Sequence, residues 1–172
     1  MSCNHNGTLT DIKDASPYFT AFFTGKEDAV LRDINFNMTI DEVKKTEPSR
    51  LYEATTDHLF YEFSFPTDST AFSEYANIQY SFNENNQLDV ITSNIYLNDT
   101  LQYQKLKNNL LQYYNQRFGE SEINSNKDEV WKGVFKDKNT TENYGYTVSV
   151  INLEDEQDIN AIGVTIEYYL QR

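Results

Sequence analysis

Six segments of this chain alternate apolar with polar residues, and this alternation indicates a fold built on a β-sheet. The predicted strands cover residues 59–65, 78–82, 88–97, 130–135, 144–153 and 161–170. In the last of them Ile162, Val164, Ile166, Tyr168 and Leu170 share one parity. A sheet with one apolar parity has one buried face and one face in water.

The links between these strands predict that they run antiparallel. Residues 83–86, Asn-Glu-Asn-Asn, are typical of a hairpin turn, because Asn tolerates the left-handed backbone of tight turns. Strands joined by such short turns must be antiparallel. Between Leu88 and Leu97 the apolar parity changes, and this change predicts a bulge or a twist.

Two segments have the spacing of helices. Thr39 and Glu42 form a capping box that starts a short helix over 39–47, which Pro48 ends. A longer helix over 100–118 has apolar residues every three or four positions, with Asp99 or Asn98 as its cap and Gly119 at its end.

The order of these elements predicts an α+β fold: an antiparallel sheet of about six strands with two main helices on one face. Helix and three strands occur twice, in the half-repeats 35–97 and 98–172. We expect residues 1–16 to form a polar tether and residues 17–172 to form a single domain, as the length of 172 residues suggests.

The charge balance limits the partners. With 14 Lys and Arg against 27 Asp and Glu, the net charge is −13. Such a field repels phosphates, so nucleic acid and the surface of an anionic membrane are excluded as partners. No apolar run approaches the ~18 residues that a bilayer span needs.

The sequence contains few residues for catalysis. His5 lies in the tether, and His58 at a strand start is read as a solvated side chain. The acidic loop 154–158 could hold a calcium ion, but it lacks the spacing of an EF-hand and is read as a solvated turn. We therefore expect no catalytic residue, no metal ion and no cofactor. The sequence carries no signal for a particular oligomeric state.

The single cysteine, Cys3, lies in the stretch Ser-Cys-Asn-His-Asn-Gly at residues 2–7. In bacterial lipoproteins the mature chain begins at a lipid-bearing cysteine, usually after a small residue and before a polar tether. This stretch resembles such a junction in a chain whose signal peptide was removed upstream. We expect Cys3 to be the lipid anchor, and the only membrane attachment, of a cell-envelope protein. The alternative is a free cysteine in a secreted or cytoplasmic protein.

Polar and aromatic residues on the wet parity of the last two strands define a candidate binding face. They are Thr147, Ser149, Thr165, Glu167 and Tyr169. Tyrosine is favoured at binding surfaces because a large rigid ring is combined with a polar tip. The alternative for this tyrosine is plain packing of a half-buried ring.

The start of the first helix also carries a family resemblance. The motif consists of Asn37, Met38, Thr39, Glu42 and Val43. It resembles the helix start of the beta-lactamase-inhibitor-protein-like superfamily, which includes the small outer-membrane assembly lipoproteins of Gram-negative bacteria. The hairpin 80–88 and the helix 106–119 are also similar to parts of those modules, whereas Asn37 stands where many members have Gly. The resemblance implies tandem modules in which helices back an antiparallel sheet.

These observations favour a non-catalytic binding or scaffold module of the cell envelope, whose partner is a protein or an envelope polymer. A secreted protein inhibitor is one alternative, which the resemblance permits. A carboxylate-based glycan hydrolase is another, and it requires a cleft with two carboxylates roughly 5–9 Å apart.

Overall fold

The computed structural model describes residues 12, 14–23, 29–65, 74–137, 140–154 and 162–172. The helices are α1 (Pro17–Phe22), α2 (Ile40–Thr46) and α3 (Thr100–Phe118). The strands are β1 (Arg50–Ala54), β2 (His58–Ser64), β3 (Tyr75–Phe82), β4 (Leu88–Leu97), β5 (Glu122–Ile123), β6 (Glu129–Lys136), β7 (Asn143–Glu154) and β8 (Ile162–Gln171).

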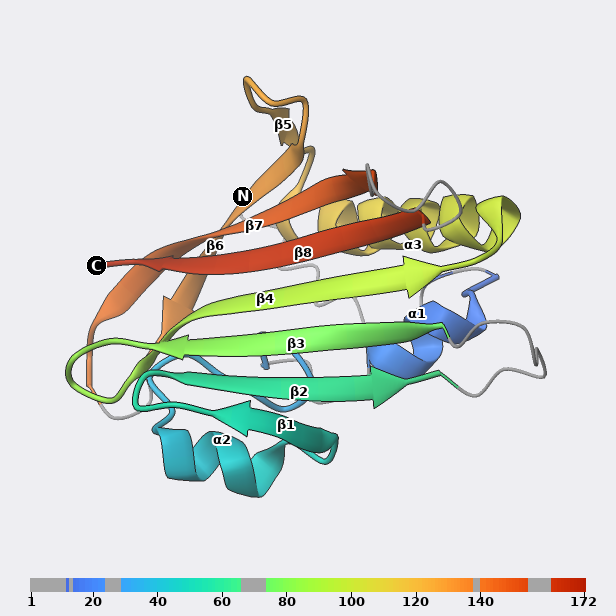
Figure 1. The fold of residues 1–172 in the computed structure, drawn as a ribbon. Coiled ribbons are helices and arrows are strands. Elements are labelled where there is room, and N and C mark those ends of the chain that lie inside the picture. Colours follow the sequence, from blue (N-terminus) through green and yellow to red (C-terminus); the bar gives the residue numbers. More distant parts are fainter. Residues whose placement is uncertain (1–11, 13, 24–28, 66–73, 138–139, 155–161) are drawn as a thin grey trace.

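The eight strands form one antiparallel sheet in the order β1-β2-β3-β4-β8-β7-β6-β5. Within β1–β4 and within β5–β8, each strand pairs with the next, so each half is a meander. Figure 1 shows how the last strands of the two meanders, β4 and β8, meet in the middle of the sheet. The half-repeats 35–97 and 98–172 each hold one helix followed by four strands.

The α+β class with an antiparallel sheet is confirmed, but the predicted count of six strands is wrong. The missed strands are β1, whose five residues are all exposed, and β5, which has only two residues. Neither strand has a buried parity, so neither produces the alternation from which the other six are predicted.

The capping box predicted at Thr39 is confirmed at the start of α2. The Thr39 hydroxyl accepts the Glu42 N–H, and the Glu42 carboxylate accepts the Thr39 N–H at 2.8 Å. These bonds favour the charged carboxylate and lower the pKa of Glu42, the bond from the Thr39 backbone most strongly. Val43, one turn further on, is fully buried and fixes the helix to the core.

The long helix α3 has the predicted bounds and caps. The Asp99 carboxylate accepts the N–H groups of Leu101 and Gln102, and Gly119 ends the helix with φ of +89°. Its buried side is formed by Tyr103, Leu106, Asn109, Leu110 and Tyr114.

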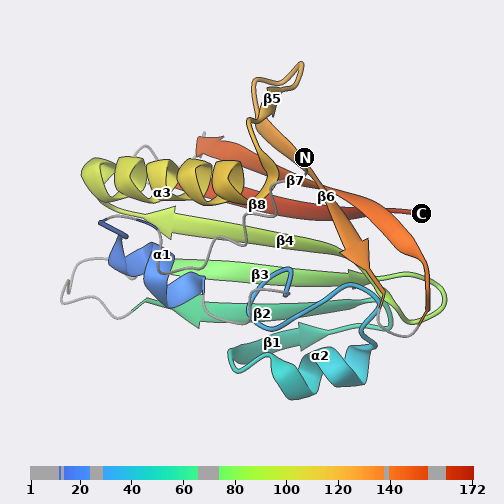
Figure 2. The same cartoon turned by 180° about the vertical axis from the view of Figure 1, so that it is seen from behind.

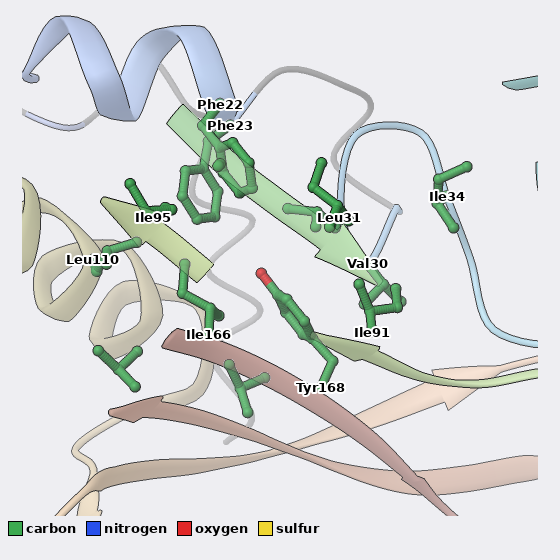
Figure 3. Close-up of a cluster of buried hydrophobic side chains, with 14 of the residues drawn as sticks. Phe22, Phe23, Val30, Leu31, Ile34, Ile91, Ile95, Leu110, Ile166 and Tyr168 are labelled. Atoms are coloured by element: carbon green, nitrogen blue, oxygen red, sulfur yellow. The ribbon is translucent and has the colours of Figure 1, made fainter. Parts of the chain in front are cut away.

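The core lies between the sheet and the helices α1 and α3. Figure 2 shows both helices on the same side of the sheet, and Figure 3 shows Ile95, Ile166 and Tyr168 extending from the central strands toward Phe22 and Phe23. The hydroxyls of Tyr114 and Tyr168 share a hydrogen bond inside this layer. Burying a polar tip with a partner avoids the cost of an unpaired group.

The helix layout differs from the prediction. The face of the sheet is covered by α3 together with α1, which the sequence had indicated only as an apolar patch. Figures 1 and 2 both place α2 beside β1 at one end of the sheet. The start of α1 is explained by Pro17 in its first turn and by the Ser16 hydroxyl, which accepts the Phe19 N–H at 3.0 Å.

The predicted turn and bulge are both present in the β3–β4 hairpin. Asn86 has φ of +59°, and the Asn83 side chain accepts the N–H groups of Asn85 and Gln87. Ser81 pairs with Val90 but Phe82 pairs with Leu88, so Asp89 is the extra residue of a bulge. The bulge explains the change of parity along β4.

The packed part of the chain begins before the predicted domain boundary. Ile12 and Ser16 are buried, and the Asp14 carboxylate lies 3.0 Å from Lys105 Nζ of α3. The predicted lipid anchor Cys3 and residues 155–158 of the acidic loop lie outside the described residues.

Candidate functional site

The sheet face opposite α1 and α3 is the candidate site, and we call it the outer face. It carries alternate residues of each long strand, such as Phe60 in β2, Gln79 in β3, Thr92 in β4, Glu167 in β8 and Ser149 in β7. These five are direct neighbours across the sheet, one per strand. The inward neighbours on either side of Gln79, Ile78 and Tyr80, are fully buried, so the parity of the face is unambiguous.

The five residues of the candidate binding face do lie together on the outer face. Thr147 pairs with Tyr169, and Ser149 pairs with Glu167, across the β7–β8 ladder. Tyr169 is 50% exposed, so half of its surface is available to a partner. Side chains directly opposite each other in an antiparallel pair are close enough to act as one surface.

Thr165 differs from the other four because it is buried. Its hydroxyl donates to Asn94 Oδ1 of β4 at 2.7 Å, and only 8% of the residue is exposed. Thr165 therefore joins the two meanders at the centre of the outer face and offers little surface to a ligand.

A hollow of about 560 Å³ lies on the outer face beside Thr165. It is lined by Tyr52, Glu53, Phe60, Tyr61, Glu62, Tyr75, Asn77, Gln79 and Asn94. These residues come from β1 to β4, so the hollow belongs to the first meander. Its volume falls within the range of small-ligand sites.

The aromatic rings of the hollow are held by their neighbours. The ring of Tyr75 stacks on Tyr96 with 4.8 Å between centroids, and Phe60 stacks on His58 at 6.1 Å. Tyr52 in the edge strand β1 is 71% exposed. Besides Tyr61, which is buried, the hollow thus combines two supported rings with one that is open to solvent.

Among the described residues that line the hollow, the charged groups are the carboxylates of Glu53 and Glu62. The Glu62 carboxylate lies 4.0 Å from the exposed guanidinium of Arg50. Next to Phe60, His58 Nδ1 lies 2.8 Å from the Asp57 carboxylate. This hydrogen bond from His58 is the main cause of a lowered Asp57 pKa.

The tyrosines of strands β3, β7 and β8 divide between the two faces. Tyr146 and Tyr168 are buried in the core, whereas Tyr75 and the candidate Tyr169 lie on the outer face. His58 is half-buried at the start of β2, and its ring supports Phe60.

Most residues of the hollow could not be assigned to a site from the sequence. Phe60 was the available signal, because an aromatic residue stands among the polar residues on the wet parity of the second strand. Tyr52 could not be placed, since β1 was not predicted. The amides of Asn77, Gln79 and Asn94 converge only through the register of β3 and β4.

The described residues show neither a metal site nor a membrane-spanning helix. In this part of the chain no three His, Cys, Asp or Glu side chains are grouped as a metal site would require. Among the same residues, no helix has the length and apolar character of a membrane span. Comparison of the chain with family models, with curated proteins and with solved structures gives no match.

Proposed function

We propose that this protein is a non-catalytic binding module of the cell envelope that engages its partner through the outer face. The observation that carries the proposal is the asymmetry of the fold. Helices α1 and α3 cover one face of the sheet, and the opposite face presents a hollow, an exposed tyrosine and a row of hydroxyl and amide side chains. An antiparallel sheet that packs one face on the core leaves the other face in water, where a partner can reach it.

The place in the envelope rests on Cys3 as a lipid anchor, in a protein of the beta-lactamase-inhibitor-protein-like superfamily. The doubled arrangement of one helix and four strands supports the tandem modules that the resemblance implies. Metabolic labelling of the full-length protein with a palmitate analogue tests the anchor. Label is expected on the native protein and absent from Cys3→Ser, and equal labelling of both would refute the anchor.

The two alternatives predict different results. A secreted inhibitor would give no lipid labelling and would bind a single enzyme tightly. A glycan hydrolase would use Glu53 and Glu62 of the hollow as its carboxylates. It would therefore release shorter products from an oligosaccharide, which chromatography detects.

Photo-crosslinking tests the outer face as the contact surface. A benzophenone amino acid replaces Thr147 on the outer face, and in a control it replaces Asn108, which is exposed on α3. In the native host we expect adducts with an envelope component from position 147 only. Adducts from position 108 alone would place the contact on the helical side and refute the proposal.

A further inference from the structure

We propose that the hollow on the outer face binds a neutral oligosaccharide. This inference rests on the proposed function, since it names the ligand class for one part of the outer face. It uses the hollow of about 560 Å³ over β1 to β4, which no sequence pattern had indicated.

Aromatic rings in the hollow offer surfaces on which sugar rings can stack. The faces of aromatic rings carry partial negative charge, and the C–H groups of a sugar ring carry partial positive charge, so the two stack well. Tyr52 is exposed and therefore open to this contact. The ring of Phe60 stacks on the ring of His58. Tyr75 is fixed by its stack on Tyr96. Three rings in one hollow offer several stacking positions along a short chain of sugars.

The amide side chains of the hollow can form hydrogen bonds with sugar hydroxyls. A sugar hydroxyl both donates and accepts hydrogen bonds, and an Asn or Gln side chain matches it with a carbonyl and an NH₂ group. Asn77 and Gln79 lie on the same side of β3, and Asn94 is the partner of Asn77 across the ladder to β4. Because Asn94 Oδ1 accepts the Thr165 hydroxyl, its amide nitrogen is the group that would donate to a ligand.

The negative charge of the lining and of the whole protein disfavours anionic ligands. Among the residues that the structure describes, the lining contains Glu53 and Glu62 and no Lys, Arg or His. The whole protein has a net charge of −13. This field disfavours phosphorylated, sulfated and uronic-acid chains. Carboxylates are good acceptors for sugar hydroxyls. The Glu62 carboxylate lies 4.0 Å from the exposed guanidinium of Arg50. Neutral sugars therefore fit the hollow better than anionic polymers.

The test uses the full-length protein in two-dimensional ¹H–¹⁵N NMR titrations. The neutral probes are cellohexaose, maltohexaose and hexa-N-acetylchitohexaose, the anionic probe is hexagalacturonate, and the cationic probe is hexalysine. We expect at least one neutral probe to shift the amide signals of β2 and β3. In Tyr52→Ala and in Gln79→Ala the affinity should fall by about tenfold.

The control variants Leu101→Ala and Gln104→Ala change exposed residues of α3 and should keep the native affinity. Unchanged melting temperatures would show that all four variants are folded. Binding of hexalysine in place of the neutral probes, sensitive to Tyr52→Ala, would overturn the proposal in favour of a cationic partner. Failure of every probe at millimolar concentration would also overturn it. Crosslinking from position 147 together with either result would leave the outer face as the binding surface and refute only the sugar ligand.

Discussion

At the scale of single residues, a buried ion pair joins Arg32 and Glu47. The guanidinium of Arg32 lies 3.2 Å from the Glu47 carboxylate, and their side chains are 4% and 0% exposed. Tyr80 donates to the same carboxylate at 2.7 Å, and Arg32 lies over the ring of Phe63 at 4.7 Å. Arg32 has φ of +51°, a strained conformation for a side chain of this size. The ion pair therefore fixes a strained loop to the end of α2 and to the sheet.

Removing the charge of Glu47 should be costly for this reason. In Glu47→Gln the Arg32 charge stays buried without its counter-charge, and we expect the free energy of unfolding in urea to fall by about 3–5 kcal/mol. The control is Glu122→Gln, which breaks the exposed pair with Lys132 at 2.8 Å. That change should cost less than about 1 kcal/mol. Equal losses in the two variants would contradict the structural role of the buried pair.

Alkaline pH should destabilise the protein through Tyr18. Its hydroxyl donates to the Glu74 carboxylate at 2.5 Å, and burial together with this bond raises the pKa of Tyr18 from 10.0 to about 12. The unfolded chain loses this proton near pH 10 and the folded chain keeps it, so the unfolded state binds fewer protons. The stabilisation is complete below pH 10 and is lost as the pH rises toward 12.

Urea unfolding across this pH range measures the effect. Tyr18→Phe has no proton to lose at this position, so the stability of the variant should fall less steeply than that of the native protein above pH 10. Parallel curves for the two proteins would show that Tyr18 does not contribute to the alkaline loss.

At the scale of elements, the pairing of β6 with β7 depends on a glycine. A Cβ atom on Gly133 would lie 2.4 Å from the ring of Tyr146, its partner across the ladder. That ring is buried in the core and contacts Phe36 and Phe118, so it has little room to move. A glycine is needed at position 133 for this close approach.

Gly133→Ala should therefore lower the free energy of unfolding by about 1–3 kcal/mol through overpacking. Gly145 is the matched control in β7, because a Cβ there would meet only the flexible side chain of Gln171, at 3.2 Å. Chemical denaturation of both variants checks this comparison. A loss for Gly145→Ala as large as that for Gly133→Ala would refute the role of the Tyr146 contact.

The elements that the sequence predicted well are those with their own local signal. The strand β4 and the helix α3 have the predicted bounds, because one has a buried parity and the other has caps at both ends. Helix α1 has only six residues and too few turns for a periodic pattern, and β1 has no buried side chain. These elements form through pairing and packing with distant parts of the chain.

The candidate site also has one part that could be predicted from the sequence and one part that could not. Thr147, Ser149, Glu167 and Tyr169 could be placed on one face because two long strands alternate clearly. The hollow could not be predicted, because it needs the pairing of four strands and the stacking of Tyr75 on Tyr96 across a ladder. The burial of Thr165 depends likewise on the meeting of β4 and β8, because its partner Asn94 lies 71 residues earlier in the chain.

At the scale of the whole molecule, one sheet has two different faces. The helical side holds the aromatic core, including Phe22, Tyr80 and Trp131, and the outer side holds the hollow and the polar rows. The net charge of −13 favours solubility of the protein and disfavours anionic partners. The central claim is therefore that the outer face, and not the helical side, contacts the partner.

Hydroxyl-radical footprinting of the side chains tests this claim most directly. The full-length protein is labelled alone and with an envelope extract of its host, and mass spectrometry measures the oxidation of Tyr52, Tyr169 and Leu101, which are 71%, 50% and 78% exposed. We predict that the extract protects Tyr52 and Tyr169 on the outer face and leaves Leu101 on α3 unchanged. Protection of Leu101 with unchanged oxidation of both tyrosines would contradict the account.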